Sequence, residues 1–183
     1  MEKSILAGLN ETASGKSSEG QQFCGDIDMR IARDGTWFYH GSPIGRKQMV
    51  KLFSTVLKRD ETGDFWLETP VEKCRIKVDD APFVAVAMDA TGTGSDQSLV
   101  FRTNLEDTVT AGPDFPIRVT IDRDSGEPSP YVLVRDRLEA LIARAVFYDL
   151  VELGVEEMRA GGPVLGVWSG GVFFELGYVN GHG

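Results

Sequence analysis

The sequence predicts an α+β protein of two duplicated β-β-α-β units, with an antiparallel sheet packed on one helix in each unit. Three observations lead to this prediction. Short stretches alternate between apolar and polar residues, two stretches carry apolar residues at helical spacing, and the helical stretch recurs at a constant shift. The chain has 183 residues, which is enough for two small domains.

The first unit is expected over residues 22–72, after a disordered leader at residues 1–21. Residues 27–31 alternate between apolar and polar side chains, as a half-buried strand does. An Asp-Gly turn at residues 34–35 leads into a returning strand at residues 37–40. The unit is therefore predicted to begin with a β-hairpin.

A helix is expected next, entered at Pro43, because the apolar residues that follow have the spacing of one helical face. These residues are Met49, Leu52, Phe53, Val56 and Leu57. A glycine turn and a short aromatic strand at residues 65–67 complete the predicted unit.

The second unit is expected over residues 73–178, with a tail at residues 179–183. Its strands are predicted at residues 74–78, 83–88, 99–103, 117–121, 131–134, 164–168 and 172–176. A second helix is predicted from an apolar face made by Leu138, Leu141, Ile142, Ala145 and Val146. We expect this antiparallel meander, closed by the helix, to curl into an open barrel.

The proposed duplication rests on an alignment of the two predicted helices. Arg46 aligns with Arg135, and the apolar residues of the first helix then meet those of the second at the same shift. Any two amphipathic helices align at some shift, so the alignment alone does not exclude chance. The hairpin before each helix and the glycine turn and aromatic strand after it favour duplication.

Composition and charge restrict the function. With 28 acidic and 19 basic residues, the net charge of −9 argues against binding to nucleic-acid polymers or anionic membranes. No apolar run approaches the roughly 20 residues of a membrane span, and the polar N-terminus does not resemble a signal peptide. Cys24 and Cys74 are too few for a disulfide framework or a zinc site, so we expect buried thiols in a cytoplasmic protein.

No catalytic constellation is visible, so the sequence predicts a non-enzymatic protein without cofactor or metal. His40 and His182 are expected at the surface. The pairs Asp26/Asp28 and Asp79/Asp80 fit turns or solvated strand ends. An enzyme that uses Asp26 and Asp28 with a divalent ion is the third hypothesis, after the two binding functions below.

Arginines are the candidate ligand-binding residues. Arg46 and Arg135 stand at the expected helix starts, where the helix dipole disfavours a cation. A bound anion or an ion pair with a neighbouring aspartate explains such a position. In the ligand hypothesis, arginines contact phosphate, a tryptophan stacks on a ring and an asparagine forms hydrogen bonds. The candidates are Arg33, Trp37, Arg46, Arg102, Asn104, Arg118 and Arg135.

Several segments resemble a proteobacterial family of uncharacterised proteins, a family defined by a domain of unknown function. The segments are residues 24–31, 34–37, 43–46, 70–73, 78–83, 101–104 and 111–114, with Pro116 and Arg118. The resemblance covers residues 23–176. It implies a duplicated core of two domains, the second like a pleckstrin-homology barrel, a nucleotide-like ligand at the domain interface, and a part in signal transduction. It implies no activity and no catalytic residues.

The sequence therefore leaves two candidate binding functions. The first is a signalling protein that binds a small anionic ligand, such as a nucleotide, at the interface of its two domains. The alternative is a protein–protein adaptor without a small ligand, in which strands at residues 164–176 offer an edge to a partner. A polar-rimmed pocket favours the ligand, and a flat exposed apolar patch favours the adaptor.

Overall fold

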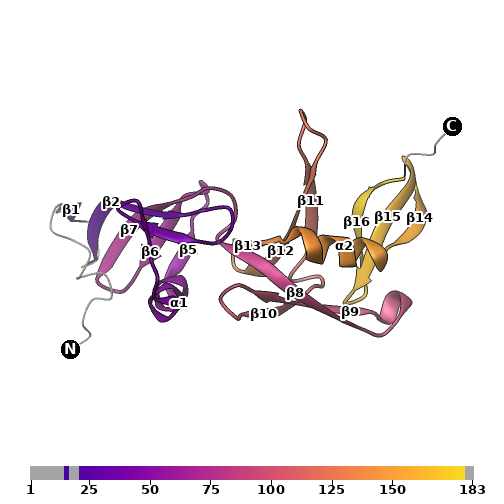
Figure 1. The fold of residues 1–183 in the computed structure, drawn as a ribbon, viewed down its shortest axis with the longest axis horizontal. Coiled ribbons are helices and arrows are strands. Elements are labelled where there is room, and N and C mark those ends of the chain that lie inside the picture. The colour runs from indigo at the N-terminus through magenta and orange to yellow at the C-terminus, as the bar shows by residue number, and fades with distance from the viewer. Residues whose placement is uncertain (1–14, 17–20, 180–183) are drawn as a thin grey trace. The chain divides into compact units, whose positions relative to one another are not determined.

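The structure is a computed structural model that describes residues 15–16 and 21–179 (Figure 1). Most of the expected leader, and the tail after residue 179, lie outside the described residues. Residues 15–16 of that leader form a short strand paired antiparallel with the first long strand.

The chain is mostly sheet, with two helices, and the α+β prediction is confirmed. The first unit contains β1 (Gly15–Lys16), β2 (Gln22–Ile31), β3 (Trp37–Tyr39), β4 (Ser42–Pro43), α1 (Lys47–Thr55), β5 (Leu57–Arg59), β6 (Phe65–Glu68) and β7 (Glu72–Val78). Then follow β8 (Phe83–Thr91), a 3-10 turn (Gly94–Asp96), β9 (Ser98–Thr103), β10 (Thr108–Thr110), β11 (Ile117–Ile121), β12 (Pro128–Arg135) and β13 (Leu138–Ile142). The chain ends with α2 (Arg144–Glu152), β14 (Val155–Arg159), β15 (Gly162–Ser169) and β16 (Val172–Tyr178).

The chain divides into two compact units. One ends at Pro82 and also takes in Asp136–Leu138, and the other begins at Phe83. The boundary therefore lies ten residues after the expected one at residue 72, because β7 completes the first sheet. It pairs with β2 on one side and with β6 on the other.

The duplication is confirmed by the strand order of the two large sheets. The first runs β4-β3-β2-β7-β6-β5 and the second β10-β9-β8-β13-β12-β11. In each sheet, two antiparallel three-stranded meanders join through one central parallel pair, β2 with β7 and β8 with β13. The prediction of wholly antiparallel sheets is thus corrected at this central pair.

The alignment that suggested the duplication was wrong in its register. Residues 138–142, predicted as the start of a helix, form β13, in which Leu138, Ala140 and Ile142 are buried. The helix begins only at Arg144. Along the chain, α1 comes between the two meanders of the first sheet, whereas α2 comes after the last strand of the second sheet. The two helices are therefore not equivalent.

The first helix overlaps the predicted one but is shorter at both ends. Pro43, its expected entrance, lies in β4, and the helix begins at Lys47. It ends before Val56, and Leu57 begins β5. Val50 and Phe53 are its buried apolar residues, while Met49 and Leu52 are exposed. Phe53 packs against Trp37 of β3, with ring centroids 6.3 Å apart. α1 therefore closes the core of the first unit through a stacked aromatic pair.

The two cysteines form a disulfide, in contrast to the expected free thiols. Cys24 of β2 and Cys74 of β7 are both buried, with Cα atoms 4.9 Å apart. The bond joins the central parallel pair of the first sheet. The argument from free thiols to a reducing compartment therefore no longer holds. In the described part of the chain, no helix is long and apolar enough to cross a membrane.

A third, small sheet follows α2, in the order β14-β15-β16. The adaptor hypothesis placed an open edge at residues 164–176. β15 is instead the middle strand, and β16 lies beside β11 of the second sheet. β16 and β14 are the two terminal strands of this sheet, and β14 lies outside the residues predicted to offer the edge.

Candidate functional site

The first unit carries a polar hollow of about 430 Å³ beside β2, β7 and the turn between β5 and β6. Apolar groups of Phe65 and Ile76 form part of its wall. Three carboxylates and two cations also line it, namely Asp26, Asp64, Asp79, Arg75 and Lys77. The hollow therefore offers both hydrogen-bond donors and acceptors to a small polar ligand.

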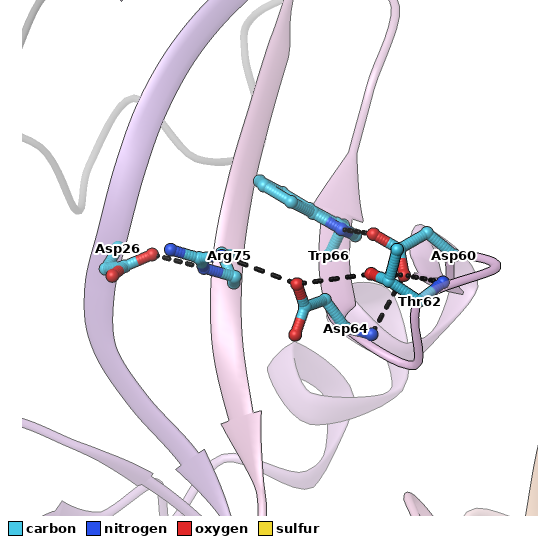
Figure 2. Close-up of polar contacts among 6 residues, drawn as sticks. All are labelled: Asp26, Asp60, Thr62, Asp64, Trp66 and Arg75. Atoms are coloured by element: carbon cyan, nitrogen blue, oxygen red, sulfur yellow. Dashed lines mark hydrogen bonds and ion pairs between the residues drawn. The ribbon is translucent and has the colours of Figure 1, made fainter.

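Arg75 is the central charged group of the hollow, and Figure 2 shows it between two aspartates. Its Nε donates to Oδ1 of Asp26 at 2.5 Å, and its Nη1 donates to Oδ2 of Asp64 at 3.4 Å. Asp26 stands opposite Arg75 in the β2–β7 pair, so sheet register brings the two together. The hydrogen bond from Arg75 lowers the pKa of Asp26.

Asp60 organises the turn that carries Asp64. Its Oδ1 accepts hydrogen bonds from the Thr62 hydroxyl at 2.7 Å and the Asp64 amide at 2.9 Å. Its Oδ2 accepts from Nε1 of Trp66 at 2.8 Å (Figure 2). The hydrogen bonds from these donors hold the pKa of Asp60 well below its usual range, and the one from the Thr62 hydroxyl has the largest effect.

We expect Asp60→Asn to make the first unit less sensitive to acid. Because the folded state lowers the pKa of Asp60, its carboxylate stabilises the fold above the unfolded pKa, and this contribution is lost as the pH falls. Between about pH 4 and about pH 2, the stability of the wild type should therefore fall more steeply than that of the variant. Urea unfolding at a series of pH values measures both slopes.

The control for this experiment is Asp89→Asn, which removes an exposed carboxylate from β8 in the second unit. It should retain the steep wild-type slope. Equal slopes for wild type and Asp60→Asn would show that the hydrogen bonds in the turn do not favour the charged carboxylate.

The other two charged residues of the hollow differ in their surroundings. Asp79 is ion-paired with Arg30 of β2. Lys77 is exposed on β7 and makes no ion pair with other residues that the structure describes. Its charge adds to that of Arg75 in lowering the pKa of Asp26. Lys77 is therefore the cation of the hollow most accessible to a ligand.

The candidates that the sequence predicted in the first unit do not line this hollow. Arg33 forms an ion pair with Asp80 at 3.4 Å. Arg46 is exposed at the start of α1. Trp37 is only 1% exposed and packs in the core, so it has no free face on which a ligand ring could stack.

The candidates in the second unit mostly have protein partners. Arg118 binds Glu139 at 2.8 Å, and Arg135 lies 5.8 Å from the ring centre of Phe83. Asn104 accepts a hydrogen bond from the Val84 amide at 3.0 Å, so it extends the pairing of β8 and β9. Arg102 is exposed on β9. Arg135 ends β12 and is not at a helix start, which removes the reason for treating it as the equivalent of Arg46.

Asp26 and Asp28, the pair considered for binding a divalent ion, contact other side chains instead. Asp26 binds Arg75, and Asp28 lies 3.4 Å from Nδ1 of His40. Among the described residues, no group of three or more His, Cys, Asp or Glu side chains is arranged to hold a metal ion.

Sequence reasoning did not select Asp64, Arg75 or Lys77. One signal was present: Arg75 and Lys77 are the polar positions of a predicted alternating strand, Asp28 is a polar position of another, and Asp26 directly precedes that second strand. Opposite charges on two outward faces indicate neighbouring strands. These charges indicate a site only once the pairing of β2 with β7 is known.

Comparisons with known proteins agree with the two units. Residues 20–81 match the model described as "Domain of unknown function (DUF1285), N-terminal domain". Residues 82–176 match "Protein of unknown function (DUF1285), C-terminal domain". A crystal structure of a DUF1285 family protein from Silicibacter pomeroyi DSS-3 is 50% identical, with a TM-score of 0.82, and the match covers 98% of this chain and 97% of that one. The chain belongs to the DUF1285 family.

A second DUF1285 structure, from Shewanella baltica OS155, is 26% identical with a TM-score of 0.55. That match covers 69% of this chain and 92% of the other. No curated protein matches the chain. The resemblance to a proteobacterial family of unknown function is thus confirmed, and the likeness of its second DUF1285 domain to a pleckstrin-homology barrel stays a prediction.

Proposed function

We propose that this DUF1285 protein is a non-enzymatic signalling protein that binds a small anionic ligand, such as a nucleotide, in the hollow of its first unit. The observation that carries the proposal is the presence of accessible Lys77 and of Arg75 beside three carboxylates in one concave site. The sequence suggested a site at the domain interface. The proposal moves it into the first unit, because residues of that unit alone line the hollow.

The mixed charge of the hollow suits a nucleotide better than a bare anion. A phosphate group would bind the Lys77 ammonium and compete with Asp26 for the Arg75 guanidinium. The carboxylates of Asp64 and Asp79 would accept hydrogen bonds from ribose hydroxyls or a base amine. The volume of about 430 Å³ falls within the usual range for small-ligand sites, roughly 300 to 1,000 Å³.

Thermal unfolding with a panel of nucleotides, cyclic nucleotides and dinucleotides tests the proposal, with phosphate and sulfate as ion controls. A ligand at about 100 times its Kd stabilises the folded protein by roughly 2.7 kcal/mol, which raises Tm by several degrees. We expect a nucleotide-specific rise that Lys77→Ala abolishes.

Two variants serve as matched controls, because each also removes one exposed cation from the first unit. Lys58→Ala lies outside the hollow, where Lys58 forms a long ion pair with Glu68 at 3.9 Å. Arg46→Ala removes the candidate that the sequence favoured. Both should retain the rise in Tm. A flat panel would contradict ligand binding, and loss of the rise in Arg46→Ala but not in Lys77→Ala would place the ligand elsewhere.

A further inference from the structure

β14 presents an open strand edge on the small sheet. In the order β14-β15-β16, β14 pairs with β15 only, and no other described strand pairs with its outer side (Figure 1). Its side chains are largely exposed, including Val155 at 44% and Met158 at 78%. The strand contains no lysine, proline or bulge, but three of its five residues are charged, Glu156, Glu157 and Arg159, so a second strand must match these charges in order to pair.

The direction of the backbone groups along this edge follows from Pro163. Pro163 lies opposite Met158, has no N–H, and its carbonyl accepts from the Val179 amide on the β16 side at 3.0 Å. Met158 and Pro163 are therefore a pair without hydrogen bonds between them, and the N–H and C=O of Met158 point to the open side. Because these directions alternate along an antiparallel strand, the backbone N–H and C=O of Glu156 also point to the open side.

We propose that β14 pairs antiparallel with β14 of a second copy of this chain, with Met158 opposite Met158 at the twofold axis. The pairing joins the two small sheets into one continuous sheet. At the axis, each Met158 amide donates to the carbonyl of the partner's Met158, so groups without a strand partner become paired.

Charge selects this register over its neighbours. An axis at Glu156, at Glu157 or at Arg159 would place that residue directly opposite the same residue of the second copy. Like charges directly opposite each other are destabilising. With the axis at Met158, Glu157 lies opposite Arg159 twice, as a closely spaced pair without backbone hydrogen bonds.

The charged pair of the proposed register lies on one face of β14. Within one chain, Arg159 binds Glu157 at 3.1 Å, so both side chains lie on the same face of β14. Arg159 also contacts β16, with its Nε 3.9 Å from Glu175 and its guanidinium 4.9 Å from the ring centre of Phe173. In the dimer the guanidinium would turn from these contacts toward the axis and bind the partner's Glu157 as well. On the other face, the exposed Met158 side chains would cover each other.

The mass of the full chain in solution, measured by light scattering over a concentration series, tests the proposal. We expect twice the mass of a single chain at high concentration. Arg159→Glu should raise the dimer Kd about tenfold, because two attractive cross-strand pairs become repulsive. Glu157→Arg should act alike, and the double variant Glu157→Arg/Arg159→Glu should restore the dimer.

Met158→Pro gives an independent check. It removes the Met158 N–H, which donates to the second copy in the proposed dimer and makes no hydrogen bond to β15. We expect a monomer whose circular dichroism matches that of the wild type. A wild-type chain that is monomeric at every concentration would overturn the proposal. So would a dimer that neither Met158→Pro nor the charge exchange affects.

Discussion

We expect reduction of the Cys24–Cys74 bond to lower the free energy of unfolding of the first unit by about 4 kcal/mol. The bond closes a loop between residues 50 apart in sequence, and such a closure restricts the unfolded chain. Both cysteines are buried, so the reduced thiols keep their packing as small apolar side chains. The loss therefore comes mainly from the unfolded state.

Urea unfolding with and without reductant measures this loss. Tryptophan fluorescence reports mainly on the first unit, because Trp37 and Trp66 lie there and Trp168 lies in the second. The matched control is Cys24→Ala/Cys74→Ala, which should unfold at the lower urea concentration whether or not reductant is present. An unchanged wild-type midpoint on reduction would contradict the expectation, as would alkylation of both cysteines in the untreated protein.

Local patterns predicted β2, β3, β6 and most of α1 in the first unit, but not β4 or β5. The alternation at residues 27–31 is part of β2, and the Asp34-Gly35 turn leads into β3. Both patterns depend on neighbours along the chain, which the sequence displays directly. The second helix was misplaced because Leu138, Leu141 and Ile142 have helical spacing, while Ala140 is too small to reveal the strand period that buries it.

Pairing between distant strands could not be predicted in the same way. Strands joined by a short turn must be antiparallel, but no local sequence pattern indicates that β2 and β7 pair with each other in parallel. The disulfide and the hollow both depend on that pair. Cys74 stands opposite Gly25, next to Cys24, and Arg75 stands opposite Asp26.

The arginines show the same limit at the site. Arg75 and Arg118 are both strand residues with carboxylate partners, and their local sequences do not distinguish them. Arg118 also lies over the ring of Tyr131, 4.3 Å from its centre, whereas Arg75 lines the hollow. An arginine becomes a candidate ligand-binding residue only through the surface on which the fold places it.

We expect Trp37→Ala to lower the free energy of unfolding by about 3 to 5 kcal/mol. Trp37 is among the largest fully buried side chains, and its removal leaves a cavity beside Phe53. Its Nε1 has no hydrogen-bond partner among the described residues, and a buried donor of this kind is itself destabilising. Trp37→Phe removes the unpaired donor and keeps a ring, so its loss should be clearly smaller than that of Trp37→Ala.

Urea unfolding of both variants, with Phe38→Ala as the control, distinguishes a core residue from a ligand-stacking one. Phe38 is the next aromatic residue on β3 but is only half-buried, beneath the Arg30 guanidinium at 4.7 Å. Its replacement should therefore destabilise the fold less than Trp37→Ala. If Trp37→Ala instead left the stability unchanged and abolished a nucleotide-dependent rise in Tm, the ring would be a ligand contact. The hollow would then be the wrong site, since Trp37 does not line it.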